Sequence, residues 1–175
     1  VKSNIPTIAS VKPYTPLELH GRDIYVREGC YTCHSQMVRP FRSETERYGE
    51  YAKAGEFVYD HPFQWGSKRT GPDLLRVGGK YQNSWHFYHM LDPGKFVKGS
   101  LMPPFPHLFE DVIDLDGTKP RIEAMQTLGV PYPEGFADKA NEDLMKQATA
   151  ITEDLKKGGI EIGSDREIIA LIAYL

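Results

Sequence analysis

Cysteine is scarce in this sequence. Only two cysteines occur among the 175 residues, Cys30 and Cys33, and two residues separate them. The disulfide framework of a small secreted domain needs several cysteines spread along the chain, so this pair cannot provide one. The pair therefore has a local chemical role.

Long hydrophobic runs and an excess of basic charge are also lacking. No stretch approaches the roughly 18 consecutive apolar residues of a membrane-spanning helix, and residues 1–10 do not have the charged and apolar regions of a signal peptide. The formal net charge is -3, so no basic field is available to hold a nucleic-acid backbone. We therefore expect no nucleic-acid partner.

What the sequence does contain is an ordinary globular composition and a clear first helix. Hydrophobic residues make up 40% and charged residues 26%, which suits one core in a single domain. Thr15, Pro16 and Glu18 supply an N-cap, a first-turn proline and a capping box. Together with the apolar residues that follow, they predict an amphipathic helix that ends near Gly29.

Three further helices are predicted along the chain. Asn83 and Ser84 can cap a helix over residues 85–91, which the sequence Asp-Pro-Gly then ends. Apolar residues at helical spacing predict a long helix over residues 136–155. Ser164 with Glu167 predicts a second capping box, at the start of an apolar terminal helix.

The segments between these helices are predicted to be irregular. Residues 35–80 are rich in Arg, Gly, Pro and aromatics without a sustained period, so we expect mostly structured loop there, with a short helix within residues 44–54. Residues 107–135 are acidic and rich in turn-forming residues. The expected fold class is therefore mainly α.

The residues from Cys30 to His34 form a C-x-x-C-H motif. Two thiols one helical turn apart can add to the two vinyl groups of a haem, while the histidine that follows binds the iron. A thioredoxin-type redox pair or half of a zinc site are the alternatives, but a βαβ pattern and a second pair of ligands are lacking. The motif therefore predicts one covalently attached haem c.

Pro72 is the expected partner of the His34 ring. It lies in the turn Thr70-Gly71-Pro72-Asp73-Leu74 and has no N–H, which leaves its carbonyl free to accept a hydrogen bond from the ring nitrogen that does not bind iron. Such a bond fixes the tautomer and the orientation of the imidazole.

Met102 is the expected sixth ligand of the iron. A thioether suits an iron that changes oxidation state at high potential without binding small molecules, and Met102 lies on a stiff segment with three prolines. The other methionines fit less well: Met37 is too close to His34, Met90 lies in an aromatic helix, and Met125 and Met145 belong to later segments. Bis-histidine alternatives remain open, with His61, His86, His89 or His107 in place of Met102.

Two further residues are expected to contact the haem. The two haem propionates need hydrogen-bond donors, and Arg69 and Trp85 lie near the Gly-Pro turn and the helix that follows it. We predict that both donate to the propionates.

The order of these motifs resembles the class I cytochromes c. A C-x-x-C-H motif follows the first helix, and Gly-Pro-Asp-Leu, an aromatic helix, Met102-Pro103 and an apolar terminal helix come after it. The resemblance implies the class I cytochrome c fold, in which the first and last helices cross. The matching positions are Gly21 and Tyr25 in the first helix against Ile169, Ile172 and Tyr174 in the last.

Two long insertions depart from the small cytochromes c. The first follows His34 and runs to Arg69; the second separates the Met102 segment from the terminal helix. The first insertion looks like that of the monohaem cytochrome c subunit (subunit II) of cbb-three-type cytochrome c oxidases. This similarity covers residues 21–108 closely, and also the terminal pattern over residues 167–175.

The resemblance implies a place in a respiratory complex. Members of that family are held by one N-terminal transmembrane helix at the periplasmic face of the bacterial inner membrane. They pass electrons toward the haem-copper catalytic subunit of a proton-pumping oxidase, beside a further cytochrome c subunit. We therefore expect residues 1–14 to be an exit segment after an anchor that this chain lacks, and residues 15–175 to be one cytochrome c domain.

Two other functions remain open from the sequence. A haem sensor or peroxidase-like enzyme would need Met102 to leave the iron, and the sequence offers no clear distal acid-base pair. A freely diffusing electron carrier would need a cleaved signal peptide before residue 1. In the leading interpretation the chain is not an enzyme in isolation.

Overall fold

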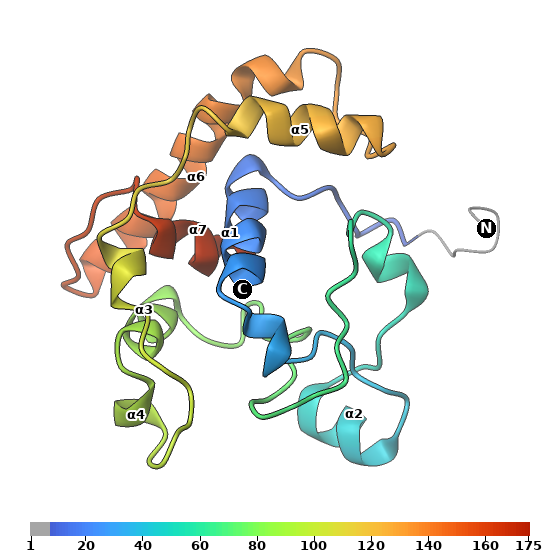
Figure 1. The fold of residues 1–175 in the computed structure, drawn as a ribbon, viewed down its shortest axis with the longest axis vertical. Coiled ribbons are helices and arrows are strands. Elements are labelled where there is room, and N and C mark those ends of the chain that lie inside the picture. Colours follow the sequence, from blue (N-terminus) through green and yellow to red (C-terminus); the bar gives the residue numbers. More distant parts are fainter. Residues whose placement is uncertain (1–7) are drawn as a thin grey trace.

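The computed structural model describes residues 8–175, so residues 1–7 of the predicted exit segment lie outside the described residues. Within residues 8–175 the regular structure is helical and contains no strand, which confirms the mainly α prediction. The helices, drawn in Figure 1, are α1 (Pro16–Arg27), α2 (Arg42–Tyr48), α3 (Asn83–Leu91), α4 (Pro93–Phe96), α5 (Thr118–Thr127), α6 (Phe136–Lys157) and α7 (Glu167–Tyr174). None of the described helices is long and apolar enough to cross a bilayer.

Helix α1 begins as the sequence predicts. The Thr15 hydroxyl accepts a hydrogen bond from the Glu18 N–H at 3.2 Å, and the Glu18 carboxylate accepts from the Thr15 N–H at 2.8 Å. This capping box satisfies two of the donors that a helix start leaves free. The helix ends at Arg27, and Gly29 then adopts a left-handed conformation (φ 69°) that turns the chain into the C-x-x-C-H motif.

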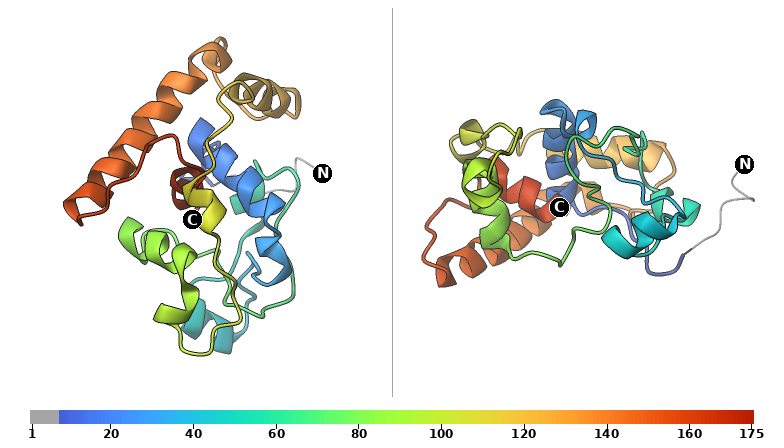
Figure 2. Two further views of the ribbon diagram at one scale, coloured as in Figure 1. Left: turned by 60° about the vertical axis from the view of Figure 1, so that its left-hand side comes forward. Right: turned by 90° about the horizontal axis from the view of Figure 1, so that it is seen from below.

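Helices α1 and α7 cross at the centre of the molecule (Figures 1 and 2). Gly21 makes the crossing possible, because a Cβ atom at this position would lie 2.0 Å from the Ala170 carbonyl oxygen. Tyr25 packs on Tyr174, with 5.4 Å between the ring centroids. The pairing of the first and last helices predicted from the resemblance is therefore present.

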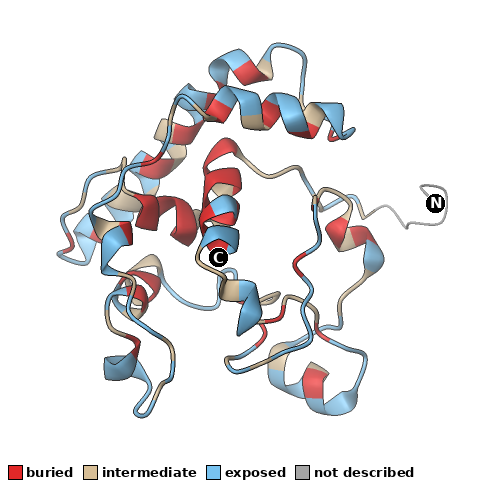
Figure 3. Cartoon of the chain, in the orientation of Figure 1, coloured by how far each residue is buried: buried red, intermediate tan, exposed pale blue. Residues whose placement is uncertain are grey.

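The main core is built around this crossing. Leu17, Ile24 and Tyr25 of α1 are buried against Ile168 and Leu171 of α7. Figure 3 shows that buried residues concentrate on these two helices. Side chains of this size that lose contact with water supply most of the stabilising free energy of a fold.

The structure corrects the expectation for residues 107–135. This segment contains a full helix, α5, where we expected only turns. Its buried residues Ile122 and Met125 pack with Leu19 of α1 and Ala140 of α6 in a second, smaller core. The helix carries few apolar residues, so its apolar face is recognisable only from the helices that cover it.

Three helix boundaries also differ from the predictions. Helix α3 begins at Asn83 rather than after it, and the Asn83 amide donates to Asp154 at 2.9 Å instead of capping. Ser164 does not cap α7, and the Glu167 carboxylate accepts from Arg27 instead of closing a capping box. The short helix expected within residues 44–54 is α2, which begins at Arg42 and ends at Tyr48. In the first two cases a side chain that the local pattern assigned to a cap bonds a distant residue instead.

A buried histidine joins the second insertion to α1. The His20 side chain is 4% exposed, and its Nε2 atom lies 2.9 Å from the Thr118 hydroxyl at the start of α5. Burial, together with the positive charge of Arg121, lowers the pKa of His20 from 6.5 to about 4. His20 is therefore neutral in the folded protein at neutral pH.

We predict that Gly21→Ala destabilises the protein. The new methyl group would overlap the backbone of Ala170, so α1 and α7 must separate, and we expect a net loss of about 1–3 kcal/mol in the free energy of unfolding despite the better helix propensity of alanine. Chemical denaturation measures this loss. Gly94→Ala is the matched control, because a Cβ atom in α4 meets only the Asp92 carboxylate at 3.4 Å. Equal stability of the two variants would contradict the prediction.

We also predict that stability falls as the pH is lowered. The pKa of His20 is lowered in the folded state, so between pH 6.5 and about pH 4 the unfolded chain binds a proton that the folded protein does not. Above pH 6.5 His20 makes its full contribution to the free energy of unfolding. This contribution declines by about 1–3 kcal/mol as the pH falls from 6.5 to about 4. Denaturation at several pH values should show a smaller decline for His20→Gln than for the wild type. The same decline in both proteins would refute the assignment to His20.

Candidate haem-binding site

The C-x-x-C-H motif forms a single tight turn directly after α1. Its first residues make a 3-10 turn (Cys30–Thr32), in which the N–H groups of Cys33 and His34 both donate to the Cys30 carbonyl, at 3.1 and 2.9 Å. Both thiols are free; Cys30 is half-buried and Cys33 is exposed. Burial raises the pKa of the Cys30 thiol to about 11, so this thiol is protonated.

The His34 ring is held from one side by the Gly-Pro turn. Its Nδ1 atom lies 2.7 Å from the Pro72 carbonyl oxygen, as the sequence predicted. Since a carbonyl only accepts, Nδ1 carries the proton and Nε2 keeps its lone pair for a metal. The ring rests on Gly71, where a Cβ atom would lie 2.2 Å from the His34 Cε1 atom.

Met102 lies on a segment fixed to the aromatic helix. The Phe105 N–H donates to the Met90 carbonyl of α3 at 2.9 Å, and the Met102 N–H donates to the Ser100 hydroxyl at 3.2 Å. Met102 is half-buried and packs against the main core. Its binding to iron stays a prediction.

Helix α3 contributes two of the four alternative histidines. His86 is 4% exposed, and burial lowers its pKa to about 4. The Nδ1 atom of His89 is buried and has no hydrogen-bond partner among the described residues. Burial lowers the pKa of His89, and the nearby His34 imidazole lowers it further.

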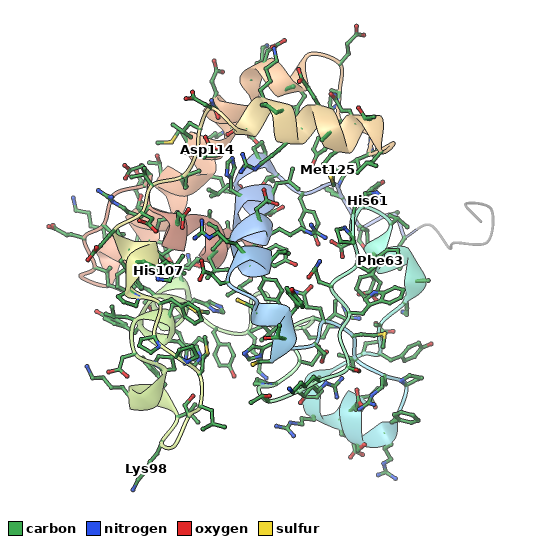
Figure 4. All side chains as sticks on the ribbon, viewed as in Figure 1. His61, Phe63, Lys98, His107, Asp114 and Met125 are labelled. Carbon is green, nitrogen blue, oxygen red and sulfur yellow. The ribbon has the colours of Figure 1, made fainter. Side chains whose placement is uncertain are left out.

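The other two histidines lie on opposite sides of α1 (Figure 4). His107 faces the Glu28 carboxylate, with 3.2 Å between its Nε2 atom and the nearer oxygen. His61 precedes a cis peptide bond to Pro62, and its carbonyl accepts from Arg22 at 3.3 Å. Of the four alternatives, only His89 has a buried ring nitrogen that is left unpaired among the described residues.

The two predicted propionate donors have protein partners in the structure. Arg69 donates to the Ser35 hydroxyl at 2.6 Å, the Met37 carbonyl at 2.9 Å and the Glu44 carboxylate at 2.8 Å. Trp85 stacks on Tyr81 and on His89, with ring centroids 4.0 and 4.5 Å away. Donation to a haem by Arg69 or Trp85 stays a prediction.

A comparison with protein families decides what this arrangement belongs to. The model of the family described as "Cytochrome C oxidase, mono-heme subunit/FixO" matches residues 1–175. The chain belongs to this family. No curated protein matches it. The resemblance to the monohaem subunit of cbb-three-type oxidases is thereby confirmed, and the family implies one haem and partner subunits of an oxidase.

The residues present fit the haem that a mono-haem subunit carries. Two free thiols and an imidazole on one turn are the donor set for a c-type attachment. Gly71 leaves room for the imidazole, and Pro72 directs its protonated nitrogen away from the metal. The unpartnered Nδ1 atom of His89 is a polar group in need of a partner, which a bound cofactor can supply.

The sequence did not reveal the part played by Gly71. Gly71 is not among the predicted site residues, yet the structure places it against the ring of His34, the predicted iron ligand. The available signal was its position directly before Pro72, which brings its Cα close to any ring that binds the Pro72 carbonyl.

We predict that Gly71→Ala disturbs His34. A methyl group at 2.2 Å from Cε1 forces the ring away from the Pro72 carbonyl, so we expect holoprotein with a weakened iron–histidine bond, or a lower yield of covalent haem. Haem staining and the optical spectrum measure both effects. Gly78→Ala is the control, since its Cβ atom would meet only the Leu175 carbonyl at 3.5 Å. A normal spectrum and yield for Gly71→Ala would contradict the assignment.

Proposed function

We propose that this oxidase subunit binds one haem c covalently through Cys30 and Cys33 and transfers single electrons. The observation that supports this most is the geometry of one turn, in which both thiols lie beside an imidazole whose Nδ1 atom is occupied by the Pro72 carbonyl. When bound, the haem supplies an iron that alternates between two oxidation states one electron apart.

The chain's own residues make the site suitable for electron transfer rather than catalysis. His34 and Met102 would both bind the iron, so no iron position would be left open to oxygen and other small ligands. Pro72 fixes the tautomer of His34 through a bond of 2.7 Å. The core residues that pack on Cys30 and Met102 would give the haem an apolar surface to lie against.

The proposal places the subunit at the periplasmic face of the bacterial inner membrane. Residues 1–14 would be the exit segment of an N-terminal anchor, and residues 15–175 one cytochrome c domain. The electron acceptor would be the haem-copper catalytic subunit of a proton-pumping oxidase, with a further cytochrome c subunit as neighbour. Membership of an oxidase family supports such partners.

We predict that Met102→Ala removes the sixth iron ligand. The haem-loaded wild type should give low-spin optical and magnetic circular dichroism spectra with a His/Met signature, and Met102→Ala should lose this signature because alanine has no thioether. Met145→Ala is the matched control, since Met145 is also half-buried and packs on the same core. It should keep the wild-type spectrum.

Two outcomes would overturn this assignment. A high-spin wild type, or one that binds carbon monoxide readily when reduced, would favour a sensor or peroxidase-like enzyme. A bis-histidine wild type that Met102→Ala leaves unchanged would replace Met102 by another ligand, with His89 the first residue to substitute because of its unpaired buried nitrogen.

A further inference from the structure

Asp73 is the most completely enclosed carboxylate near the His34 turn. Its side chain is 0% exposed. One oxygen accepts from the Ser35 hydroxyl at 2.6 Å and from the Met37 N–H at 2.8 Å. The other oxygen accepts from the Leu75 N–H at 2.9 Å. A buried carboxylate with three donors is rigidly held, because breaking any of these bonds leaves a buried polar group unsatisfied.

These bonds join the two chain segments that hold the His34 ring. Ser35 directly follows His34 and Met37 lies two residues further on, whereas Asp73 directly follows Pro72, whose carbonyl accepts from the ring. Two backbone bonds run parallel to them: Gly71 N–H to the Cys33 carbonyl at 3.0 Å, and Leu74 N–H to the Ser35 carbonyl at 2.9 Å. The distance between His34 and Pro72 is thus fixed from both flanks.

The ion pair of Arg69 with Glu44 supports this arrangement from the side of α2. Arg69 donates to the Ser35 hydroxyl and to Glu44, and lies 3.6 Å from the Asp73 carboxylate. The hydrogen bond from Arg69 is the main reason why the pKa of Glu44 is lowered to about 2. Glu44 is buried, and the Arg69 guanidinium lies beside both buried carboxylates, Glu44 and Asp73.

We propose that Asp73 is a positioning residue that sets the hydrogen bond between His34 and Pro72 and thereby tunes the reduction potential of the haem. The inference rests on the proposed function, because it requires that His34 binds the iron. Asp73 acts through Ser35 and the Gly-Pro turn and does not itself contact the metal.

Loss of Asp73 should change the reduction potential of the haem in two ways, and both raise it. A firm hydrogen bond to Nδ1 makes the imidazole a stronger electron donor, which stabilises the oxidised iron. A buried negative charge nearby also stabilises the oxidised, more positive state. Loosening the bond and removing the charge both favour the reduced state, so loss of Asp73 raises the potential.

The experiment compares the reduction potentials of haem-loaded Asp73→Asn, Asp60→Asn and the wild type. Asp60 is a matched control: it is 5% exposed and binds Arg22 and the Tyr14 hydroxyl, but it lies in the segment that contacts α1 away from the Gly-Pro turn. We expect both variants to lose stability. Only Asp73→Asn should shift the reduced-to-oxidised ratio, by about tenfold, which is about 59 mV for a one-electron couple.

Ser35→Ala separates positioning from charge. It removes the hydroxyl that donates to Asp73 at 2.6 Å without changing any charge, so we expect a smaller upward shift together with altered paramagnetic NMR shifts of the His34 ring. If Asp73→Asn does not accumulate as holoprotein, the potential and the NMR shifts of Ser35→Ala still test the positioning role. Unchanged His34 shifts and an unchanged potential in Ser35→Ala would overturn the positioning role.

The spectrum of the wild type distinguishes a wrong role for Asp73 from a wrong proposed function. If the wild type has a covalent haem with a histidine ligand but Asp73→Asn matches the wild type, or shifts no more than Asp60→Asn, only the role of Asp73 is wrong. If the wild type lacks a covalent haem or a histidine ligand, the proposed function fails and the inference fails with it.

Discussion

The close contact of α1 with α7 is the constraint on which the rest of the structure depends. The two helices carry the residues of lowest and highest number in the main core, so their contact closes the chain between them into one loop. Their distance is set by Gly21, where no side chain larger than hydrogen fits against Ala170. The crossing fixes the direction of α1, and α1 in turn fixes where the C-x-x-C-H turn begins.

The two insertions are attached to this centre by different kinds of interaction. The first, over residues 35–69, is attached by polar side chains, as in the ion pair of Asp60 with Arg22 and the hydrogen bond that Asp60 accepts from the Tyr14 hydroxyl. The second, which contains α5 and α6, is attached by the apolar contacts of Ile122 and Ala140 with α1, beside the contact of His20 with Thr118. Polar attachment of this kind is directional, which suits the insertion that surrounds His34, whereas apolar attachment tolerates variation in geometry.

Most elements of the fold could be predicted from local sequence patterns, and the main failures involve residues that contact distant parts of the chain. The capping box of Thr15 and Glu18 is present because both partners lie within one turn of helix. The expected box of Ser164 and Glu167 is absent because Arg166 is the N-cap of α7, and the Glu167 carboxylate accepts from Arg27, 140 residues away in sequence. Helix α5 was not predicted because its apolar face is narrow. Its buried residues form a core only together with the distant Leu19 and Ala140.

The sequence by itself determined which residues are predicted to hold the haem, because Cys30, Cys33 and His34 have the spacing of a c-type attachment and Pro72 can offer only a carbonyl. It also determined the family, through the order of these motifs along the chain. Only the tertiary structure decided which groups surround His34. Gly71, Asp73 and Arg69 acquire their contacts across 25 to 38 residues of chain, and a local pattern carries no information about partners at that separation.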